Sequence, residues 1–220
     1  MSLTLYYHPL SSYCHKVLIA LFESGTAFDK RIINLGNASD RAELEAMWPF
    51  TRFPVIRDHL RDESVAESSI IIEYLDHYFP GAAPMIPDDW IQALEVRRWD
   101  RIFDQYVQGP LQAIVSDRIH QTSGDMGKAR ATLTTAYALI DRHVADREWI
   151  SSAGFSLADC SAAPALFYAH TLEPFPVSCV QLHAYFERLV ARPSIQRVLD
   201  ETKPYFSMYP FVDAIPARFR

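Results

Sequence analysis

The fold is decided by residues 3–25, LTLYYHPLSSYCHKVLIALFESG. Residues 3–7 are β-prone, and Pro9 with the two serines after Leu10 favours a turn. The apolar residues that follow share one helical face: Val17, Leu18, Leu21 and Phe22. Gly25 fits the left-handed position just past a helix end. The stretch therefore predicts a strand, a turn and a helix.

The next elements extend this pattern to residue 78. Residues 28–33 form a second β-like run, and a helix between two strands favours parallel pairing of those strands. A short helix is predicted at 41–47, two strands close enough for a hairpin at 54–58 and 63–66, and a helix at 67–78. The predicted order is β-α-β followed by α-β-β-α.

The second half of the chain has a different pattern. Pro80, Gly81, Pro84 and Pro87 interrupt regular structure, as a linker between domains does. Apolar stripes at helical spacing then predict helices at 90–107, 128–144, 156–170 and 182–190. The tail after Lys203 holds three further prolines and is predicted to wrap over a helical bundle as a poor helix. We expect two domains, 1–81 and 88–220.

Composition excludes several classes of protein. The chain has 220 residues, 49% apolar and 22% charged, which is typical of a folded chain. We expect no membrane span, because no apolar run approaches the roughly 20 residues required. We expect no nucleic-acid partner, because the net charge is −6.

The cell compartment and cofactor chemistry are also constrained. The first cation is Lys16, so the start of the chain has no secretory signal and a cytoplasmic location is predicted. Cys14, Cys160 and Cys179 are an odd, widely separated set, which is typical of unpaired thiols in a reducing compartment. The sequence has no GxGxxG, HExxH or CxxC motif, so neither a nucleotide site nor a metal is predicted.

Four short motifs support a family resemblance through their order and spacing. They are Ser-x-x-Cys at 11–14, Phe-Pro-Val at 53–55, Glu-Ser at 67–68 and Ser-Leu-Ala-Asp at 156–159. With the order of elements, they make the chain resemble a cytosolic glutathione transferase of the serine type. The resemblance implies an α/β thioredoxin-like N-terminal domain (βαβ-αββα) that binds glutathione. An all-α helical-bundle C-terminal domain would contribute the pocket for an electrophile.

By this resemblance Ser11 is the catalytic residue and donates a hydrogen bond to the glutathione thiolate. Such a bond to a charged group is worth about 1.5 to 3 kcal/mol, and lowering a thiol pKa by about two units takes roughly 2.7 kcal/mol. Ser11 could instead be only a helix N-cap. Ser12 and Tyr7 are alternative partners of the thiolate. Cys14 lies on the first helical turn and is either a stabilised thiolate or, as we favour, a small buried residue.

The resemblance also implies a set of glutathione-binding residues. A cis bond before Pro54 would let the backbone of Phe53 pair with the cysteinyl unit, although a trans proline on an edge strand is the local alternative. Glu67 would hold the α-ammonium group of the ligand, and Ser68 its γ-glutamyl carboxylate. A solvent-facing Glu67 and an N-cap Ser68 explain the same residues. Arg52 would meet the glycyl end.

One region departs from the family pattern, and the role of a second region is open. The family usually has Asn-Pro-x-Gly-Lys where this chain has Trp-Pro-Phe-Thr-Arg at 48–52. Phe50 could insert into a partner subunit, although we favour a Phe that covers its own core. Trp99, Phe103 and Tyr106 could form a wall of the electrophile pocket, but such a stripe is more often bundle core.

The function expected from the resemblance is transfer of glutathione, as co-substrate and without a metal, to an apolar electrophilic small molecule by a homodimer. Isomerisation, dehalogenation or peroxide reduction with glutathione would use the same fold. A non-catalytic binding or regulatory protein is a further alternative, because a fold does not fix a function.

Overall fold

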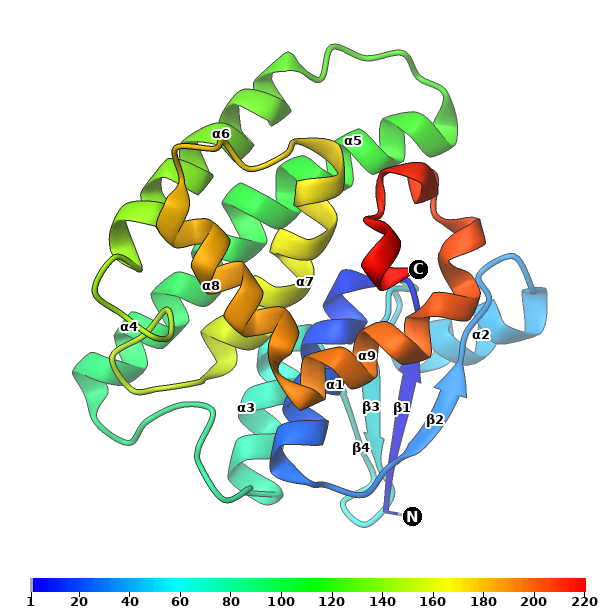
Figure 1. Cartoon of the computed structure of the whole chain (residues 1–220). Coiled ribbons are helices and arrows are strands. Elements are labelled where there is room, and N and C mark those ends of the chain that lie inside the picture. Colours follow the sequence, from blue (N-terminus) through cyan, green and yellow to red (C-terminus); the bar gives the residue numbers. More distant parts are fainter. Residues whose placement is uncertain (1) are drawn as a thin grey trace. The chain divides into compact units, whose positions relative to one another are not determined.

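The computed structural model describes residues 2–220 and divides the chain into two compact units (Figure 1). The first unit, coloured blue to cyan, ends at Ile86, and the second is Pro87–Arg220. The first unit has the thioredoxin-like arrangement and the second is all-helical. The predicted fold class is therefore confirmed.

The first unit contains the seven predicted elements in the predicted order. They are β1 (Leu3–Tyr7), α1 (Ser12–Ser24), β2 (Asp29–Ile32), α2 (Ala38–Met47), β3 (Val55–Asp58), β4 (Glu63–Ala66) and α3 (Ser68–Tyr78). The sheet order is β2-β1-β3-β4. β1 pairs with β2 in parallel, and β3 pairs with β1 and β4 antiparallel. The parallel crossover and the hairpin are both confirmed.

Strand β1 separates two parts of the core of this unit. Leu3, Leu5 and Tyr7 alternate along β1 and are buried, since successive side chains of a strand point to opposite faces. Tyr6, between them, packs with a smaller cluster built on Leu44 of α2. α1 is the most deeply buried helix of the unit, with nine of its thirteen residues buried.

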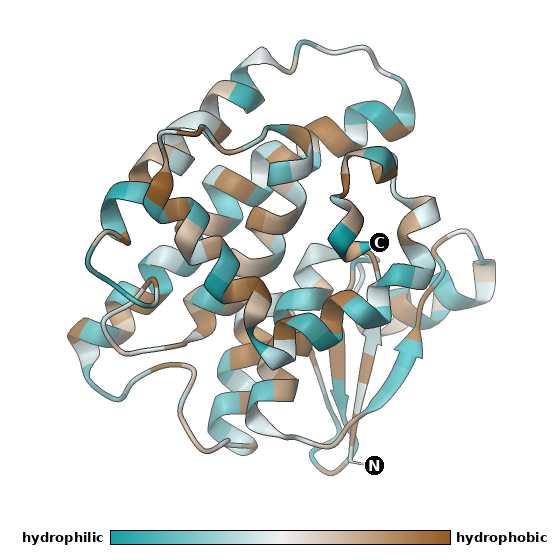
Figure 2. Ribbon diagram, in the orientation of Figure 1, coloured by the Kyte–Doolittle hydropathy of each residue, from teal (hydrophilic) through white to brown (hydrophobic). Residues whose placement is uncertain are grey.

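The second unit is built from six α-helices and a π-helical segment, counted over the described residues 87–220. These are α4 (Trp90–Ile102), the π segment (Phe103–Gln108), α5 (Gly109–His120), α6 (Gly127–His143), α7 (Leu157–Leu172), α8 (Val180–Ala191) and α9 (Pro193–Thr202). Apolar residues recur along α7 (Figure 2), and almost all of that helix is buried. The Ser156 N–H donates to Asp159 Oδ2 at 3.0 Å at its start.

Two helices of this unit were absent from the sequence-based prediction. α5 has Pro110 in its first turn, and α9 begins at Pro193. Proline is tolerated in the first turn of a helix, because the N–H that it lacks has no partner within the helix there. The predicted helices ended at residues 107 and 190, just before these prolines, whereas the prolines stand in the first turns of two further helices.

The C-terminal tail folds as short 3₁₀ turns at Lys203–Met208, Val212–Ala214 and Ala217–Phe219. Its aromatic rings lie against α7: the centroid of Phe219 is 5.2 Å from that of Phe167, and the centroid of Tyr209 is 5.2 Å from that of Tyr168. The prediction of a poor helix that wraps over the bundle is confirmed.

Burial decides between several open interpretations. Trp99 and Phe103 are buried in the helical unit, which supports bundle core, whereas Tyr106 is half exposed. Phe50 is 71% exposed, so the expectation that it covers its own core is wrong. None of the three cysteines, all within the described residues, forms a disulfide, as predicted, and all three are buried. Among residues 2–220, no helix combines the length and the apolar character that a membrane crossing requires.

Candidate functional site

The register of the sheet brings three separate segments to one edge. Tyr6 near the end of β1 pairs with Val55 at the start of β3, and Val55 pairs with Ala66 at the end of β4. The chain after β1, before β3 and after β4 therefore leaves the sheet at the same edge. Ser11, Pro54 and the start of α3 belong to these three segments.

Ser11 lies at the end of the turn that follows β1. Its N–H donates to His8 O at 3.0 Å, and its Oγ accepts from the N–H of Cys14 at 3.3 Å as the N-cap of α1. The N-cap interpretation is thus correct. A hydroxyl has one donor and two acceptor positions, so a cap bond is compatible with donation to a ligand. Ser11 is half-buried, whereas Ser12 and Tyr7 are buried.

The residues beneath this turn are deeply buried. His15 Nε2 lies 2.5 Å from Pro9 O, and because a carbonyl only accepts, Nε2 carries the proton. Burial lowers the pKa of His15 to about 4, so the imidazole is neutral. Burial raises the pKa of the Cys14 thiol to about 12, although contacts with the Ser11 side chain and the His8 backbone act in the opposite direction. Cys14 is therefore an inert core thiol, as favoured.

The starts of α1 and α3 are linked by a buried lysine. Lys16 is 1% exposed, and its Nζ donates to Ser69 Oγ at 2.8 Å. Ser68, the first residue of α3, is buried, and Glu67 before it is exposed. Glu67 has a left-handed φ of 68°, which is uncommon for a residue other than glycine. Helix N-termini attract anions, and two of them meet at this edge of the sheet.

The bond between Phe53 and Pro54 is cis, as predicted. The Phe53 ring stacks on His8, with centroids 5.8 Å apart and an interplanar angle of 20°. The Nδ1 of His8 accepts from Leu10 N at 3.2 Å, and burial lowers its pKa. Sequence reasoning missed His8; its position directly before Pro9 at the end of a strand was the available signal.

The segment between α2 and β3 carries Arg52, which is exposed. Thr51 has a φ of 52° and takes the place of the family's usual glycine. Glycine adopts this conformation without steric cost, whereas a β-branched residue is an outlier there. The Phe50 ring lies 5.1 Å from that of Trp48. Residues 48–52 of this chain thus include a residue with a left-handed φ shortly before β3.

This edge of the sheet combines features suited to an anionic peptide ligand. It has a half-buried hydroxyl, an exposed arginine, a buried serine at a helix start and an exposed glutamate. The predicted site residues all belong to the three strand connections defined above. They are Ser11, Arg52, Phe53, Pro54, Glu67 and Ser68. Over residues 2–220, no cluster of three His, Cys, Asp or Glu side chains is arranged to hold a metal ion.

Comparison with known proteins identifies the family. The profile of the glutathione S-transferase N-terminal domain matches residues 5–83, and that of the glutathione S-transferase C-terminal domain matches residues 88–197. The chain belongs to the glutathione S-transferase family.

Curated proteins with two kinds of name are similar to the chain. A stringent starvation protein A homolog of Coxiella burnetii is 26% identical over 203 residues, covering 91% of this chain and 93% of the relative. Glutathione S-transferase U24 of Arabidopsis thaliana is 24% identical over 190 residues, covering 84% of each chain. The relatives therefore include proteins named as transferases and proteins named for a starvation response.

Solved structures share the fold. A glutathione S-transferase of Methylobacillus flagellatus, solved with GSH bound, has a TM-score of 0.78 at 24% identity and covers 90% of this chain and 98% of its own. An epsilon-class glutathione S-transferase of Musca domestica has a TM-score of 0.85 at 16% identity, covering 96% and 98%.

Proposed function

We propose that this glutathione S-transferase family member binds glutathione at the edge where β1, β3 and β4 meet, and transfers it to an apolar electrophile. The observation that carries the proposal is the register Tyr6–Val55–Ala66. It brings a hydroxyl, a backbone segment preceding a strand and two helix N-termini to one edge. An anionic peptide with a thiol needs such a combination of donors.

In this proposal Ser11 activates the thiol. Its hydroxyl donates to the glutathione sulfur and favours the thiolate, which is the nucleophile. A charge-assisted hydrogen bond of about 1.5 to 3 kcal/mol accounts for a pKa decrease of one to two units. The N-terminus of α1 adds about 0.3 to 1 kcal/mol. The buried neutral His15 contributes no charge, and its contact with Pro9 O supports the turn.

The remaining residues hold the peptide. Ser68 and the N-terminus of α3 bind the γ-glutamyl carboxylate, and Glu67 binds the α-ammonium group. The backbone of Phe53, before Pro54, pairs with the cysteinyl unit. Arg52 binds the glycyl carboxylate. The exposed positions of Arg52 and Glu67 and the buried position of Ser68 are compatible with these roles.

The electrophile pocket, the homodimer and the cellular location are proposed from the family and from the exposure of particular side chains. The helical domain supplies the electrophile pocket, and half-exposed Tyr106 is a candidate wall residue. A homodimer is supported by exposed Phe50, a large apolar side chain that a partner subunit would cover. A cytoplasmic location is supported by three cysteines that form no disulfide, which suits a reducing compartment.

A second candidate function is non-catalytic regulation. It is favoured by the relatives named stringent starvation protein A homologs, which match over nine-tenths of this chain. Glutathione-dependent isomerisation, dehalogenation or peroxide reduction would instead use the same activated thiolate.

The deciding experiment combines calorimetry with an activity panel. Titration of the full chain with glutathione tests binding, and aryl halides, hydroperoxides and mixed disulfides test turnover. Binding with turnover of an aryl halide supports the proposed transferase. Binding without turnover of any substrate class favours regulation. Absence of binding contradicts the proposed site.

A further inference from the structure

Helix α2 is held only weakly by apolar contacts. It has ten residues, and within it, a segment that the structure describes completely, Leu44 alone is buried. Helices of this length are marginal on their own in water. Elements with few buried apolar side chains open locally more readily than the rest of a protein. Polar contacts therefore decide where α2 lies.

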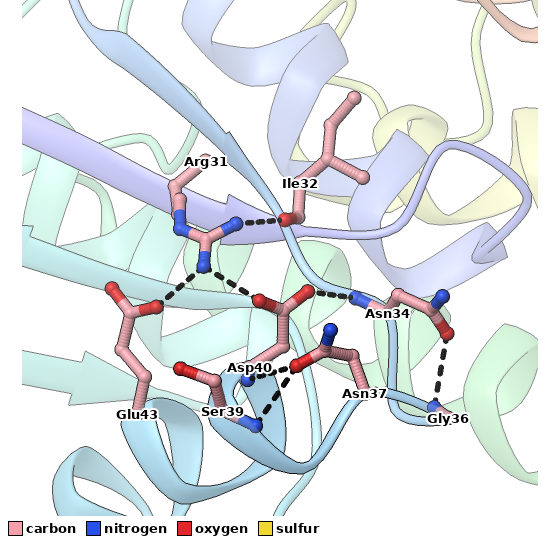
Figure 3. Close-up of polar contacts among 8 residues, drawn as sticks. All are labelled: Arg31, Ile32, Asn34, Gly36, Asn37, Ser39, Asp40 and Glu43. Atoms are coloured by element: carbon pink, nitrogen blue, oxygen red, sulfur yellow. Dashed lines mark hydrogen bonds and ion pairs between the residues drawn. The ribbon is translucent and has the colours of Figure 1, made fainter.

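Arg31 of β2 makes the central polar contacts (Figure 3). Its Nη2 donates to Asp40 Oδ1 at 2.7 Å and to Glu43 Oε2 at 2.7 Å, and its Nη1 donates to Ile32 O at 2.6 Å. Asp40 and Glu43 lie on the same face of α2, three residues apart. One guanidinium thus joins the edge strand β2 to two carboxylates of the helix, those of Asp40 and Glu43.

Asp40 also fixes the loop that leads into α2. Its Oδ2 accepts from Asn34 N at 2.8 Å. Asn37 caps the helix, because its Oδ1 accepts from Ser39 N at 2.9 Å. The start of α2 is therefore fixed both to its own loop and, through Arg31, to β2 (Figure 3).

The end of α2 leads directly into the proposed peptide-binding segment. Trp48 N donates to Leu44 O at 2.8 Å, and Thr51 N donates to Trp48 O at 2.9 Å. Trp48 and Phe53 pack on the same small cluster as Leu44, together with Val55. A displacement of α2 consequently moves the segment that carries Arg52 and Phe53.

We propose that Arg31, through Asp40 and Glu43, is a positioning residue that holds α2 and thereby places residues 48–53 for glutathione. The inference rests on the proposed function, since it concerns the same site. Arg31 does not touch the ligand. It raises the population of the arrangement in which Arg52 and the Phe53 backbone are ready to bind.

The first test does not depend on glutathione. Amide hydrogen exchange is compared between the wild-type chain and Arg31→Ala. We expect faster exchange in α2 and at the N–H groups of Trp48 and Thr51, with unchanged exchange in α1 and α3. The control is Arg57→Ala, which removes an arginine of β3 that pairs with Asp62 in the β3–β4 hairpin. It should leave the exchange of α2 unchanged.

The second test uses glutathione binding. If Arg31→Ala lowers the population of the competent arrangement to about one fifth, the apparent Kd rises about fivefold. The pKa of the bound thiol and kcat at saturating glutathione should stay unchanged, because Ser11 lies on another segment. Arg31→Lys keeps the charge but not the planar fork, so it should give an intermediate Kd.

The outcomes separate this inference from the proposed function. Unchanged exchange in α2, or equal acceleration throughout the first unit, overturns the role of Arg31. Faster exchange in α2 with an unchanged Kd also overturns it. If the wild-type chain binds no glutathione, the proposed function fails, and with it the positioning role, whatever the exchange of α2 shows.

Discussion

The two sides of the candidate site are supported in opposite ways. On the Ser11 side, nine of the thirteen residues of α1 are buried, and buried Lys16 joins α1 to α3. On the Arg52 side, α2 has one buried residue and depends on an ion-pair network. In the proposed function, thiol activation, which needs fixed geometry, belongs to the Ser11 side, which we call the rigid side. Binding of the glycyl end of glutathione belongs to the Arg52 side, which we call the adjustable side.

The largest expected effect comes from truncating one buried leucine on each side. Leu21 of α1 and Leu44 of α2 are both fully buried, and such substitutions cost about 2 to 5 kcal/mol. Leu21→Ala should lower the free energy of unfolding of the whole first unit in urea. Leu44→Ala should lower it less and accelerate amide exchange mainly in α2. If both substitutions lower the free energy of global unfolding equally, the proposed difference in support between the two sides is wrong.

Acidification should act on the rigid side through His15. Its pKa is about 4 in the fold against 6.5 normally, so the unfolded chain binds the proton first as pH falls. Stability is complete above pH 6.5 and declines toward pH 4, by up to about 3 kcal/mol. His15→Gln keeps a donor for Pro9 O without titrating in this range.

Urea unfolding of wild type and His15→Gln at several pH values measures this difference directly. Because His8 also has a lowered pKa, the comparison with the variant isolates His15. The same slope in both proteins between pH 6.5 and pH 4 would show that His15 is not the buried neutral group.

The contacts that Ser68 and Arg52 are proposed to make with glutathione should differ in their dependence on salt. Ser68→Ala, at a buried position, should weaken binding by about 1.5 to 3 kcal/mol with little effect of salt. Arg52→Ala, at an exposed position, should weaken it by an amount that shrinks as salt is added. Calorimetry at low and high ionic strength measures both. A Ser68→Ala loss that disappears in salt contradicts the assignment of Ser68 to the buried end.

The smallest effect concerns the left-handed Thr51. An L residue in this conformation costs roughly 1 to 2 kcal/mol, and glycine avoids that cost but loses more chain entropy on folding. Thr51→Gly should therefore stabilise the first unit by about 1 kcal/mol or less, whereas Thr51→Ala should not. Destabilisation by the glycine variant in urea unfolding would mean that the Thr51 side chain is needed for the loop.

Local patterns predicted more of the rigid side than of the adjustable one. The β1–α1 stretch has strand and helix periodicity within 25 residues, so its elements follow from neighbouring residues. The contacts of Arg31 with Asp40 and Glu43 join a strand to a helix, and nothing in the charge pattern indicates which partner Arg31 takes. The exposure of Phe50 likewise depends on the fold of the whole loop.

The candidate site shows the same division. The family resemblance pointed to Ser11 and to a cis bond before Pro54, and the structure has an N-cap at Ser11 and the cis bond at Pro54. His8 was missed because its contact with Phe53 joins residues 45 positions apart in sequence. α5 and α9 were not predicted; each has a proline in its first turn, and a proline suits a helix start but disrupts a helix interior.

The central claim, that Ser11 activates the thiol, is tested most directly by the pKa of glutathione bound to the full chain, measured from thiolate absorbance. Two variants separate the roles of Ser11. Ser11→Ala removes both the N-cap and the donor, and Ser11→Asp keeps a good cap but has no donor when ionised.

The account predicts a bound-thiol pKa about two units below that of free glutathione in the wild type. It predicts that both Ser11 variants raise this pKa, while Ser12→Ala and Tyr7→Phe leave it low. A low pKa that survives in both Ser11 variants and is lost in Tyr7→Phe or Ser12→Ala would contradict the account.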